Sequence, residues 1–355
     1  MALNLSQLHR VLDGYFDAAE KSDFKVKVLP LDMSPFELPV WLTRIAPIFF
    51  KKLVFIYSHI RFAFSVIPVF HKHDMVIVRE FLTIPLLISW PFLFLFRRKL
   101  LFVVNHNVQF MVSNKVQRYA FGLLARLGVR YVFLESSAGS EMSLTQDVID
   151  DCLVLPIPAQ DMERANEEVV VKTGKIVVGV IGDFREEKGN KELLNYLVNF
   201  SVAETEDVCW ELLVGTSDLE VQRWCFNKGL KVIDTKEFSE YGRAYKECDL
   251  VILNYQESAY YYRSSGAVCD AIVGRAVILC PEYPVLKQQI SKYGTVGEFF
   301  SKLTDVPAKI DRISSDLHCF NEGFSSQISE RSVNGIKDKI DLFLKGRTCD
   351  KSTTW

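Results

Sequence analysis

The chain has 355 residues, long enough for two domains, and 49% of them are hydrophobic while 24% are charged. This composition supports a large core and excludes a disordered chain. The net charge of −2 at pH 7 hides an uneven distribution, because the span from Leu38 to Leu134 holds 13 bases and only two acids, a balance of 13 − 2 = +11. Such an excess of positive charge indicates an anionic partner for the N-terminal half.

The cysteines and the N-terminus indicate where the protein works. None of the eight cysteines forms a Cys-x-x-Cys pair, and several stand inside apolar runs, as buried free thiols do. The first 24 residues are mixed and charged, unlike a secretory signal. We therefore expect a reduced, cytosolic compartment.

Strands and helices are predicted to alternate through an N-terminal domain of residues 1–157. The predicted helices are residues 5–20, 81–96 and 116–127, and the predicted strands are residues 25–31, 74–78, 100–104, 130–134 and 152–156. Proline and polar residues then indicate a linker over 158–174.

Residues 38–70 interleave bases with aromatic and aliphatic side chains and contain no acid. A basic, aromatic, amphipathic segment can lie in the interface of an anionic membrane. The alternative is a set of core helices whose basic side chains reach the surface. The residues that carry the pattern are Trp41, Arg44, Ile45, Ile48, Phe49, Lys51, Lys52, Phe55, Ile56, Arg61, Phe62 and Phe64.

The span from Phe81 to Phe96 is uncharged over 16 residues, so it must be weighed as a membrane helix. A spanning helix needs about 20 residues. This span is shorter, holds Pro85 and Pro91, and lies between two predicted strands. It is therefore predicted to be a buried crossover helix.

Residues 175–200 predict a strand, a loop and a helix. The apolar run from Ile176 to Ile181 indicates a buried strand, and an amphipathic helix follows Gly189. The loop between them carries Arg185 and Lys188, and it lies where doubly wound folds bind ligands. Two cations beside a helix N-terminus suit an anion such as a diphosphate. The alternative is a solvated loop whose charge Glu186 and Glu187 partly neutralise.

A second α/β domain is predicted over residues 175–327, followed by a helix at 328–345 that returns to the N-terminal domain and by a tail at 346–355. Asp218 and Ser239 are expected to cap two of its helices. Its predicted strands are residues 175–181, 209–214, 230–233, 249–253 and 276–280, and predicted helices between them include 218–228, 239–247 and 266–273.

The stretch from Asp249 to Pro281 carries the second chemical signal. Ser264, Ser265 and Gly266 open a predicted helix, and small residues there let a phosphate approach the unpaired N–H groups. Asp270 lies one turn further on the same face as Gly266. A carboxylate in that position can accept both hydroxyls of a ribose.

These two stretches resemble motifs of the GT-B glycosyltransferases, in particular the large retaining bacterial group (family 4-like, group 1 glycosyltransferases). The resemblance covers roughly residues 100–285. The family's Gly-x-[Ile/Leu/Phe]-Arg-x-x-Lys-Gly loop is matched by Gly182, Phe184, Arg185, Lys188 and Gly189. Its Ser-Gly-x-x-x-Glu-Ala-x-x-x-Gly-x-Pro-Val motif is matched by Ser265, Gly266, Ala271, Gly274 and Val277, with Asp270 in place of Glu and Ala276 in place of Pro.

The resemblance implies an α/β fold of two Rossmann-like domains facing a cleft, and a role for each matched residue. His106, at the end of the strand 100–104, would lie near the sugar as the catalytic residue; the alternative is a hydrogen-bonded histidine at a strand end. Ribose would be bound by Asp270, and no metal or cofactor beyond the donor is expected. The donor diphosphate would be bound by Arg185, Lys188, Ser265 and Gly266. The cleft would be lined by Gly182, Asp183, Asn107, Tyr255, Tyr262, Arg263 and Ser264. The nucleobase would be held near Gly215, Val232, Ile233 and Asp234.

We therefore expect a hexosyltransferase-type enzyme that moves a sugar from a nucleotide-diphosphate sugar to a lipid-linked, glycan or other membrane-surface acceptor in glycan or polysaccharide synthesis. It would be retaining and metal-independent, and peripheral on the inner face of the membrane. No nucleic-acid partner is expected, because the basic span lacks a nucleic-acid-binding module.

One departure from the family supports a second interpretation. Tyr262 stands where the family has a Glu that contacts the donor sugar. This favours the alternative of a catalytically inactive nucleotide-sugar-binding protein, and it leaves retention or inversion open. A nicotinamide-dependent oxidoreductase is disfavoured, because no Gly-x-Gly-x-x-Gly motif occurs.

Overall fold

The computed structural model describes residues 15, 17–29, 61, 68–78, 81–104, 114–135, 151–159, 175–201 and 210–350. The chain divides into two compact units. The C-terminal unit contains the described residues from Pro156 to Ser332, and the N-terminal unit contains those up to Leu155 together with the chain from Val333 onward. Among the described residues, no helix is both long enough and apolar enough to cross a membrane.

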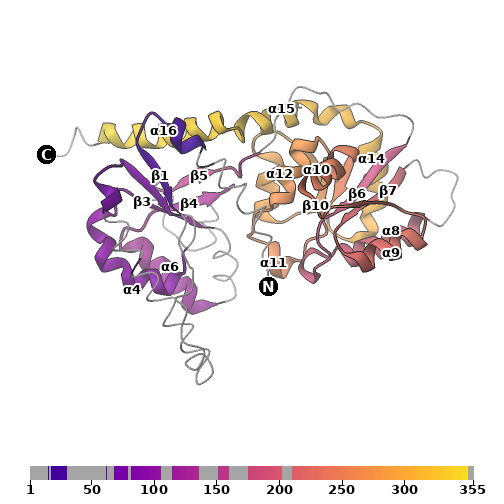
Figure 1. Ribbon diagram of the computed structural model, residues 1–355, viewed down its shortest axis with the longest axis horizontal. Helices are drawn as coiled ribbons and strands as arrows, with labels where there is room; N and C mark the ends of the chain where they lie inside the picture. The colour runs from indigo at the N-terminus through magenta and orange to yellow at the C-terminus, as the bar shows by residue number, and fades with distance from the viewer. Residues whose placement is uncertain are drawn as a thin grey trace, which may run out of the picture. The chain divides into compact units, whose positions relative to one another are not determined.

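The N-terminal unit is built on a five-stranded parallel sheet in which the strands follow one another in chain order. All four residues of β2 and of β4 are buried, because helices cover both faces of the sheet. Helices α4 (Thr83–Leu93) and α6 (Lys115–Arg126) lie on one face, and α16 (Val333–Asp350) lies on the other (Figure 1). The strands are β1 (Val26–Leu29), β2 (Met75–Val78), β3 (Leu100–Val104), β4 (Tyr131–Leu134) and β5 (Leu153–Leu155).

The predicted crossover helix at 81–96 exists, but the expectation that it is buried is wrong. The helix α4 ends at Leu93 and continues as a 3-10 turn, η1 (Phe94–Phe96). One side of α4, which includes Leu86 and Trp90, packs toward the sheet, while Ile88 on the other side is exposed. A helix that covers one face of a sheet contacts it along one side only, so an uncharged and mainly apolar sequence leaves apolar side chains in solvent.

The C-terminal unit contains a six-stranded parallel sheet with helices on both faces (Figure 1). Five predicted strands are confirmed, and β11 was not predicted because Gly297–Phe300 is short and lacks β-branched residues. The strands are β6 (Ile176–Ile181), β7 (Trp210–Thr216), β8 (Lys231–Asp234), β9 (Leu250–Ile252), β10 (Val277–Pro281) and β11 (Gly297–Phe300). The helices are α8 (Asn190–Ser201), α9 (Leu219–Asn227), α10 (Phe238–Glu247), α11 (Glu257–Tyr260), α12 (Gly266–Gly274), α13 (Pro284–Ser291), α14 (Val306–Ser314) and α15 (Asn321–Glu330).

The order of strands in this sheet is β11-β10-β9-β6-β7-β8, so the chain reverses its direction across the sheet between β6 and β9. These two strands pair in parallel, with Val178 beside Leu250 and Gly179 beside Val251. Helices on either side of such a reversal diverge to opposite faces and leave the loops after the two strands exposed. The loops that carry both sequence motifs are those after β6 and β9.

One of the two predicted N-cap residues caps its helix, and the other does not. The Asp218 carboxylate accepts hydrogen bonds from the N–H groups of Glu220 and Val221, as expected of the α9 N-cap. Ser239 is not a cap, because α10 begins one residue earlier, at Phe238.

The helix predicted at 328–345 is two helices, α15 and α16, separated at Arg331. The carbonyl of Arg331 accepts a hydrogen bond from the N–H of Ala159 instead of continuing a helical ladder. Its guanidinium is fully buried and donates to the carbonyls of Ile157 and Gln289. Arg331 therefore fastens the start of the C-terminal unit to its last helix, and α16 runs on to Asp350, beyond the expected start of the tail at 346.

The cysteines that the structure describes are free thiols, and five of the six are buried, as expected from their apolar surroundings. Burial raises the pKa of Cys152 to about 12 and that of Cys225 to about 11. Such thiols remain protonated at neutral pH and act as small apolar side chains.

Gly179 allows β6 to pack against the turn before β9, because a Cβ there would lie 2.4 Å from the Cys248 Sγ atom. We expect Gly179→Ala to lower the free energy of unfolding by about 1–3 kcal/mol, as overpacked cores do. Chemical denaturation measures this change. Adding Cys248→Ala should recover part of the loss, whereas a double variant as unstable as the sum of the two singles would contradict the steric cause. Gly242→Ala in α10 is the control, since nothing lies within 4 Å of its new methyl group.

Candidate functional site

The loop after β6 places a lysine ammonium against the backbone of a glycine. Gly182 ends the strand with φ of +117°, and the 3-10 turn η3 (Glu186–Lys188) brings Lys188 back toward it. A Cβ on Gly182 would lie 3.2 Å from the Lys188 Nζ atom. Glycine at 182 is therefore needed twice, for a backbone conformation that L-residues rarely adopt and for the approach of the ammonium.

The same loop is fastened to the end of β9. The Asn254 side chain donates a hydrogen bond of 3.1 Å to the carbonyl of Gly189, and the Gln256 N–H donates one of 3.1 Å to the carbonyl of Glu187. A Cβ at Gly189, whose φ is +60°, would lie 2.2 Å from the Asn254 carbonyl oxygen. Asn190 closes the loop from its own side by donating to the carbonyl of Asp183 at 2.9 Å.

Lys188 is buried, with 9% of its surface exposed, although it is charged at neutral pH in water. Burial lowers the pKa of Lys188 from its ordinary value, and the neighbouring Arg185 and Arg263 lower it further. Asp183 and Asp270 oppose this change by stabilising the ammonium. These five charged groups therefore lie near one another, and the loops after β6 and β9 and the helix α12 supply them.

Arg185 is more exposed than Lys188 and is paired with acids of its own loop. Its Nε atom lies 3.4 Å from an Asp183 carboxylate oxygen, and one terminal nitrogen lies 3.0 Å from a Glu187 carboxylate oxygen. Nearly half of the side chain is in solvent, so these pairs are weak and can exchange for a more highly charged anion. The acids of the loop thus partly neutralise Arg185, as the alternative interpretation expected, but they do not pair with Lys188 in the same way.

Arg263 supplies a third cation from the loop before α12. Its guanidinium lies over the Tyr260 ring, 4.9 Å from the centroid, which orients it. Among the described residues it has no ion pair. The sequence suggested only that Arg263 lines the cleft, whereas the structure places its charge close enough to affect Lys188.

The N-terminus of α12 has no side-chain cap. Ser265 cannot provide one, because its hydroxyl is hydrogen-bonded to the Tyr255 hydroxyl at 2.7 Å. The Ser265 N–H donates to the Gln289 side chain at 2.8 Å, so this N–H already has a partner within the protein. Gly266 is exposed, and nothing lies within 4 Å of where a Cβ would be. The approach to the α12 N-terminus is therefore open at Gly266 rather than at Ser265.

Asp270 lies one turn into α12 and is oriented by α10. The Tyr241 hydroxyl donates a hydrogen bond of 3.0 Å to the Asp270 Oδ2 atom and lies 3.2 Å from the Tyr245 hydroxyl. Burial raises the pKa of both tyrosines, and the Asp270 charge adds to the effect, so they remain hydroxyl donors. Tyr241 and Tyr245 were not predicted as site residues, because the contact joins positions 29 residues apart.

Three predicted cleft residues differ in their exposure. Tyr255, predicted to line the cleft, is only 3% exposed, and its ring stacks on Tyr260 with centroids 3.9 Å apart. Tyr262 is partly exposed and packs edge-on against Tyr261, with centroids 4.6 Å apart. Ser264 is partly exposed, next to the buried Ser265. Position 255 is therefore a core position, and the exposed part of this loop is 261–264.

The predicted nucleobase region lies at the ends of β7 and β8. Gly215 pairs with Ile233 in the ladder, and β8 is the edge strand of the sheet. Ile233 is buried, Val232 is half-buried, and Asp234 is exposed and accepts a hydrogen bond from the Lys236 N–H at 3.0 Å. The side chain of Ile233 thus belongs to the core, and any contact of Ile233 with a base would come from its backbone groups.

His106 and Asn107 lie outside the described residues, so their predicted roles stay predictions. Within the described ranges, no three His, Cys, Asp or Glu side chains gather as a metal site requires.

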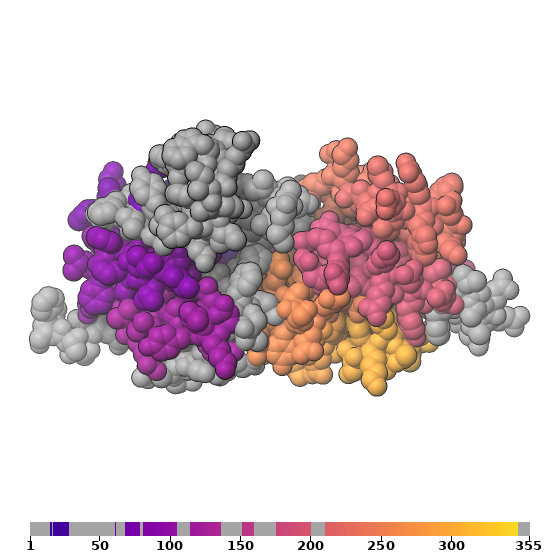
Figure 2. Space-filling model, turned by 90° about the horizontal axis from the view of Figure 1, so that it is seen from below, coloured from indigo at the N-terminus to yellow at the C-terminus, as the bar shows by residue number. Residues whose placement is uncertain are grey.

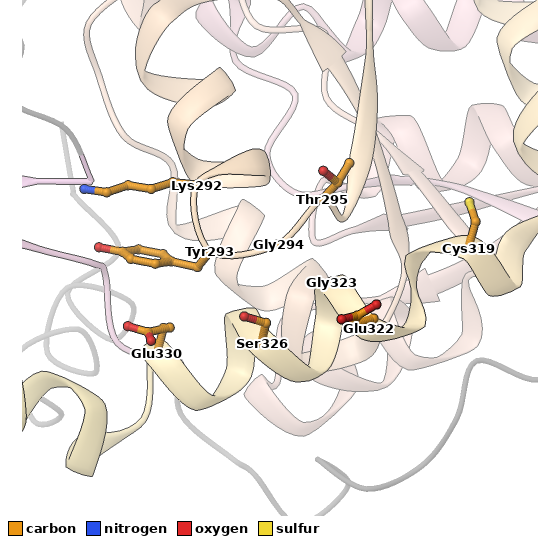
Figure 3. A pocket seen from close by; sticks show the side chains of 9 residues that line it. All are labelled: Lys292, Tyr293, Gly294, Thr295, Cys319, Glu322, Gly323, Ser326 and Glu330. Carbon is orange, nitrogen blue, oxygen red and sulfur yellow. The ribbon is translucent and has the colours of Figure 1, made fainter.

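A pocket of about 510 Å³ lies elsewhere in the C-terminal unit (Figure 3). The turn from Lys292 to Thr295, just before β11, forms one side, and α15 forms the other with Glu322, Ser326 and Glu330 at four-residue spacing. The pocket is therefore at the amino end of β11. Ligand loops of parallel sheets lie at the carboxyl ends of the strands, so this pocket is separate from the cation cluster.

The fold with this loop arrangement is that of the GT-B glycosyltransferases. HepE from Anabaena, solved in complex with UDP, is similar with a TM-score of 0.55 and 12% identity over 80% of this chain and 82% of its own. Sucrose-phosphate synthase from Thermosynechococcus elongatus has a TM-score of 0.52 and 11% identity over 84% of this chain and 78% of its own. The α,α-trehalose 6-phosphate synthase from Burkholderia multivorans has a TM-score of 0.58 and 8% identity over 85% of this chain and 78% of its own.

These likenesses confirm the predicted α/β fold with two Rossmann-like parts. No protein-family model matches the sequence, and no curated protein does. At this low identity the similarity lies in the backbone architecture.

The buried lysine has a measurable consequence for stability. Because the pKa of Lys188 is lower in the folded protein than its ordinary 10.5, the unfolded chain binds more protons between these two pKa values. The free energy of unfolding of the parent, relative to that of Lys188→Met, should therefore rise as the pH increases through this window. Denaturant titrations at neutral and alkaline pH measure the difference. Lys191→Met, at an exposed lysine three residues further on, controls for the loss of one lysine.

Proposed function

We propose that the protein is a glycosyltransferase that takes a sugar from a nucleotide-diphosphate donor and passes it to an acceptor at a membrane surface. The observation that supports this best is the convergence of Lys188, Arg185 and Arg263 beside the uncapped N-terminus of α12, at the strand-order reversal of the sheet. Cations and helix N–H groups together suit an anionic group such as a diphosphate.

The similar structures favour a uridine nucleotide as the first donor to test. HepE has been solved with UDP, with UDP and glucose, and with UDP-glucose. A trehalose-phosphate synthase from Burkholderia vietnamiensis is described as UDP-forming. Their binding and activity belong to those proteins and support UDP here by analogy.

In the proposed reaction the bond between the anomeric carbon and the β-phosphate oxygen breaks, and the leaving diphosphate gains negative charge. Lys188 would stabilise that charge most strongly, because it is buried and its field is little screened by water. The α12 N–H groups would add to this, each well-placed donor contributing on the order of 3 kcal/mol to the transition state. Arg185 would exchange its pairs with Asp183 and Glu187 for the phosphate.

Asp270 would accept the ribose hydroxyls, and Tyr241 would hold its carboxylate in place. A carboxylate fixed by a buried hydroxyl loses little rotational freedom when the ribose arrives, so less affinity is lost to ordering. Tyr241 acts through Asp270 and is a positioning residue. His106 remains the residue proposed to lie near the sugar and the incoming hydroxyl.

The acceptor is proposed to be lipid-linked or otherwise held at an anionic membrane, within glycan or polysaccharide synthesis. The support is the balance of +11 over residues 38–134 and the aromatic residues among those bases. A protein bound peripherally at the inner face would meet both a soluble donor and such an acceptor.

Tyr262 favours a second function, nucleotide-sugar binding without transfer. An aromatic ring stands where the family's carboxylate contacts the donor sugar, and Tyr262 is partly exposed on the loop before α12. Incubation with radiolabelled UDP-sugars and extracted membrane lipids separates the two functions. Transfer or donor hydrolysis supports the enzyme, whereas tight donor binding with neither supports the binding protein.

Removing the diphosphate cations should weaken nucleotide binding. We expect Arg185→Ala, Lys188→Ala and Arg263→Ala each to reduce affinity for UDP by about 1.5–3 kcal/mol, because each removes a charge-assisted contact. Lys188→Ala should have the largest effect, since its charge is buried. Isothermal titration calorimetry measures the change, and Lys191→Ala is the control at an exposed lysine. Parent-like affinity in all three variants would refute the diphosphate site.

The ribose contact can be separated from general damage to the fold by changing the ligand. Asp270→Asn and Tyr241→Phe should both bind UDP more weakly than the parent does, because one loses a carboxylate oxygen and the other loses the hydroxyl that positions it. A UDP analogue without ribose hydroxyls should bind the parent and both variants with similar affinity. Equal losses for UDP and for the analogue would show that these residues only support the fold.

A further inference from the structure

The outer side of α4 and η1 exposes a continuous row of large apolar side chains. Ile84, Ile88 and Phe92 follow one another at four-residue spacing and are 37%, 45% and 46% exposed, and Leu95 in η1 is 82% exposed. Four-residue spacing places these side chains along one side of the helix. We call these four residues the apolar stripe.

The neighbouring helix α6 also exposes apolar side chains. It lies on the same face of the sheet as α4, and the Trp90 indole donates a hydrogen bond of 3.2 Å to the Leu127 carbonyl, just after α6. Val116 and Tyr119 of α6 are 64% and 71% exposed. Figure 2 shows this side of the N-terminal unit in purple and magenta. A row of exposed apolar side chains along one helix marks an interaction site more often than single exposed residues do.

The charged residues on the same elements are all basic. Residues 81–134 contain no acid, and Arg98, Lys115, Arg118 and Arg126 are exposed. Arg97 lies over the Phe94 ring, 4.2 Å from its centroid, beside the stripe. The surface is therefore apolar along α4 and positively charged at the end of η1 and along α6.

We propose that the apolar stripe inserts into the interfacial region of an anionic lipid bilayer while the neighbouring bases contact lipid phosphates. The stripe is one side of a helix whose other side packs on the sheet, so α4 would lie in the plane of the membrane. A second copy of the chain fits this surface poorly, because it would bring two positively charged surfaces together without acids to pair them.

The stripe would be where the protein meets the membrane-surface acceptor of the proposed function, on which this proposal rests, but vesicle binding can be measured without sugar transfer. The sequence interpretation based docking of the N-terminal half on the charge balance over residues 38–134 and on the aromatic residues at 41–64. Of residues 41–64 the structure describes only Arg61, whereas the stripe is formed wholly by described residues. UDP binding measured on the same samples keeps a failure of docking distinct from a failure of the donor site.

The experiment is flotation of the full chain with vesicles of phosphatidylcholine alone or mixed with phosphatidylglycerol. The parent should float with the anionic vesicles, and high salt should reduce this binding without abolishing it, because the apolar contribution is insensitive to salt. The triple variant Ile88→Ser, Phe92→Ser, Leu95→Ser should lose binding at high salt and bind at least about tenfold more weakly at low salt.

Matched controls keep the proposal falsifiable. Leu219→Ser with Phe226→Ser removes exposed apolar residues from α9 of the other unit, at 62% and 80% exposure, and should bind vesicles as the parent does. Unchanged thermal unfolding and UDP affinity of the stripe variant show that it is folded. Equal flotation of parent and stripe variant, or no flotation of the parent, would overturn the proposal. So would a parent dimer in sedimentation that the stripe variant no longer forms, because a second copy would then cover the stripe.

Discussion

The candidate site depends on one close contact, the approach of Gly189 to Asn254. The two residues belong to loops that follow different strands, and they meet because β6 and β9 are neighbours at the point where strand order reverses. Any side chain at 189 would collide with the Asn254 backbone, and Asn254 in turn holds the Gly189 carbonyl. This contact fixes the turn that returns Lys188 toward Gly182, and so fixes the position of the buried cation.

Burying Lys188 opposes folding and favours anion binding for the same reason. An ammonium removed from water loses hydration, and the lowered pKa of Lys188 records that loss. Asp183 and Asp270 compensate in part, and a bound diphosphate would compensate further. Arg185 differs, because its exposed pairs are weak and easily exchanged. The cluster thus combines the buried charge of Lys188, which water screens little, with the exposed charge of Arg185, which can rearrange around a ligand.

The two units differ in charge and in polarity. In the C-terminal unit, acids and bases alternate around the site, and the apolar residues are largely in the core. In the N-terminal unit, the helices of one face carry bases without acids and leave apolar side chains outside. The proposed function needs both properties, a polar site for a charged donor and a surface that holds the protein where a membrane-bound acceptor lies.

The sequence by itself determined where the strands lie and that they form buried parallel sheets. Strands buried on both faces have continuous apolar, β-branched sequences such as Ile176–Ile181. It also determined the cation loop, since Gly182, Arg185 and Lys188 lie within seven residues and share one turn. It could not determine which face of α4 meets solvent, because the helix has no charged residue and its two polar residues, Thr83 and Ser89, are buried. Nor could it show that the Ser265 hydroxyl is hydrogen-bonded to Tyr255 and the Ser265 N–H to Gln289. It also could not show that the Tyr241 hydroxyl orients the Asp270 carboxylate. Those contacts join residues 10 to 29 positions apart, and only the packing of helices on the sheet brings them together.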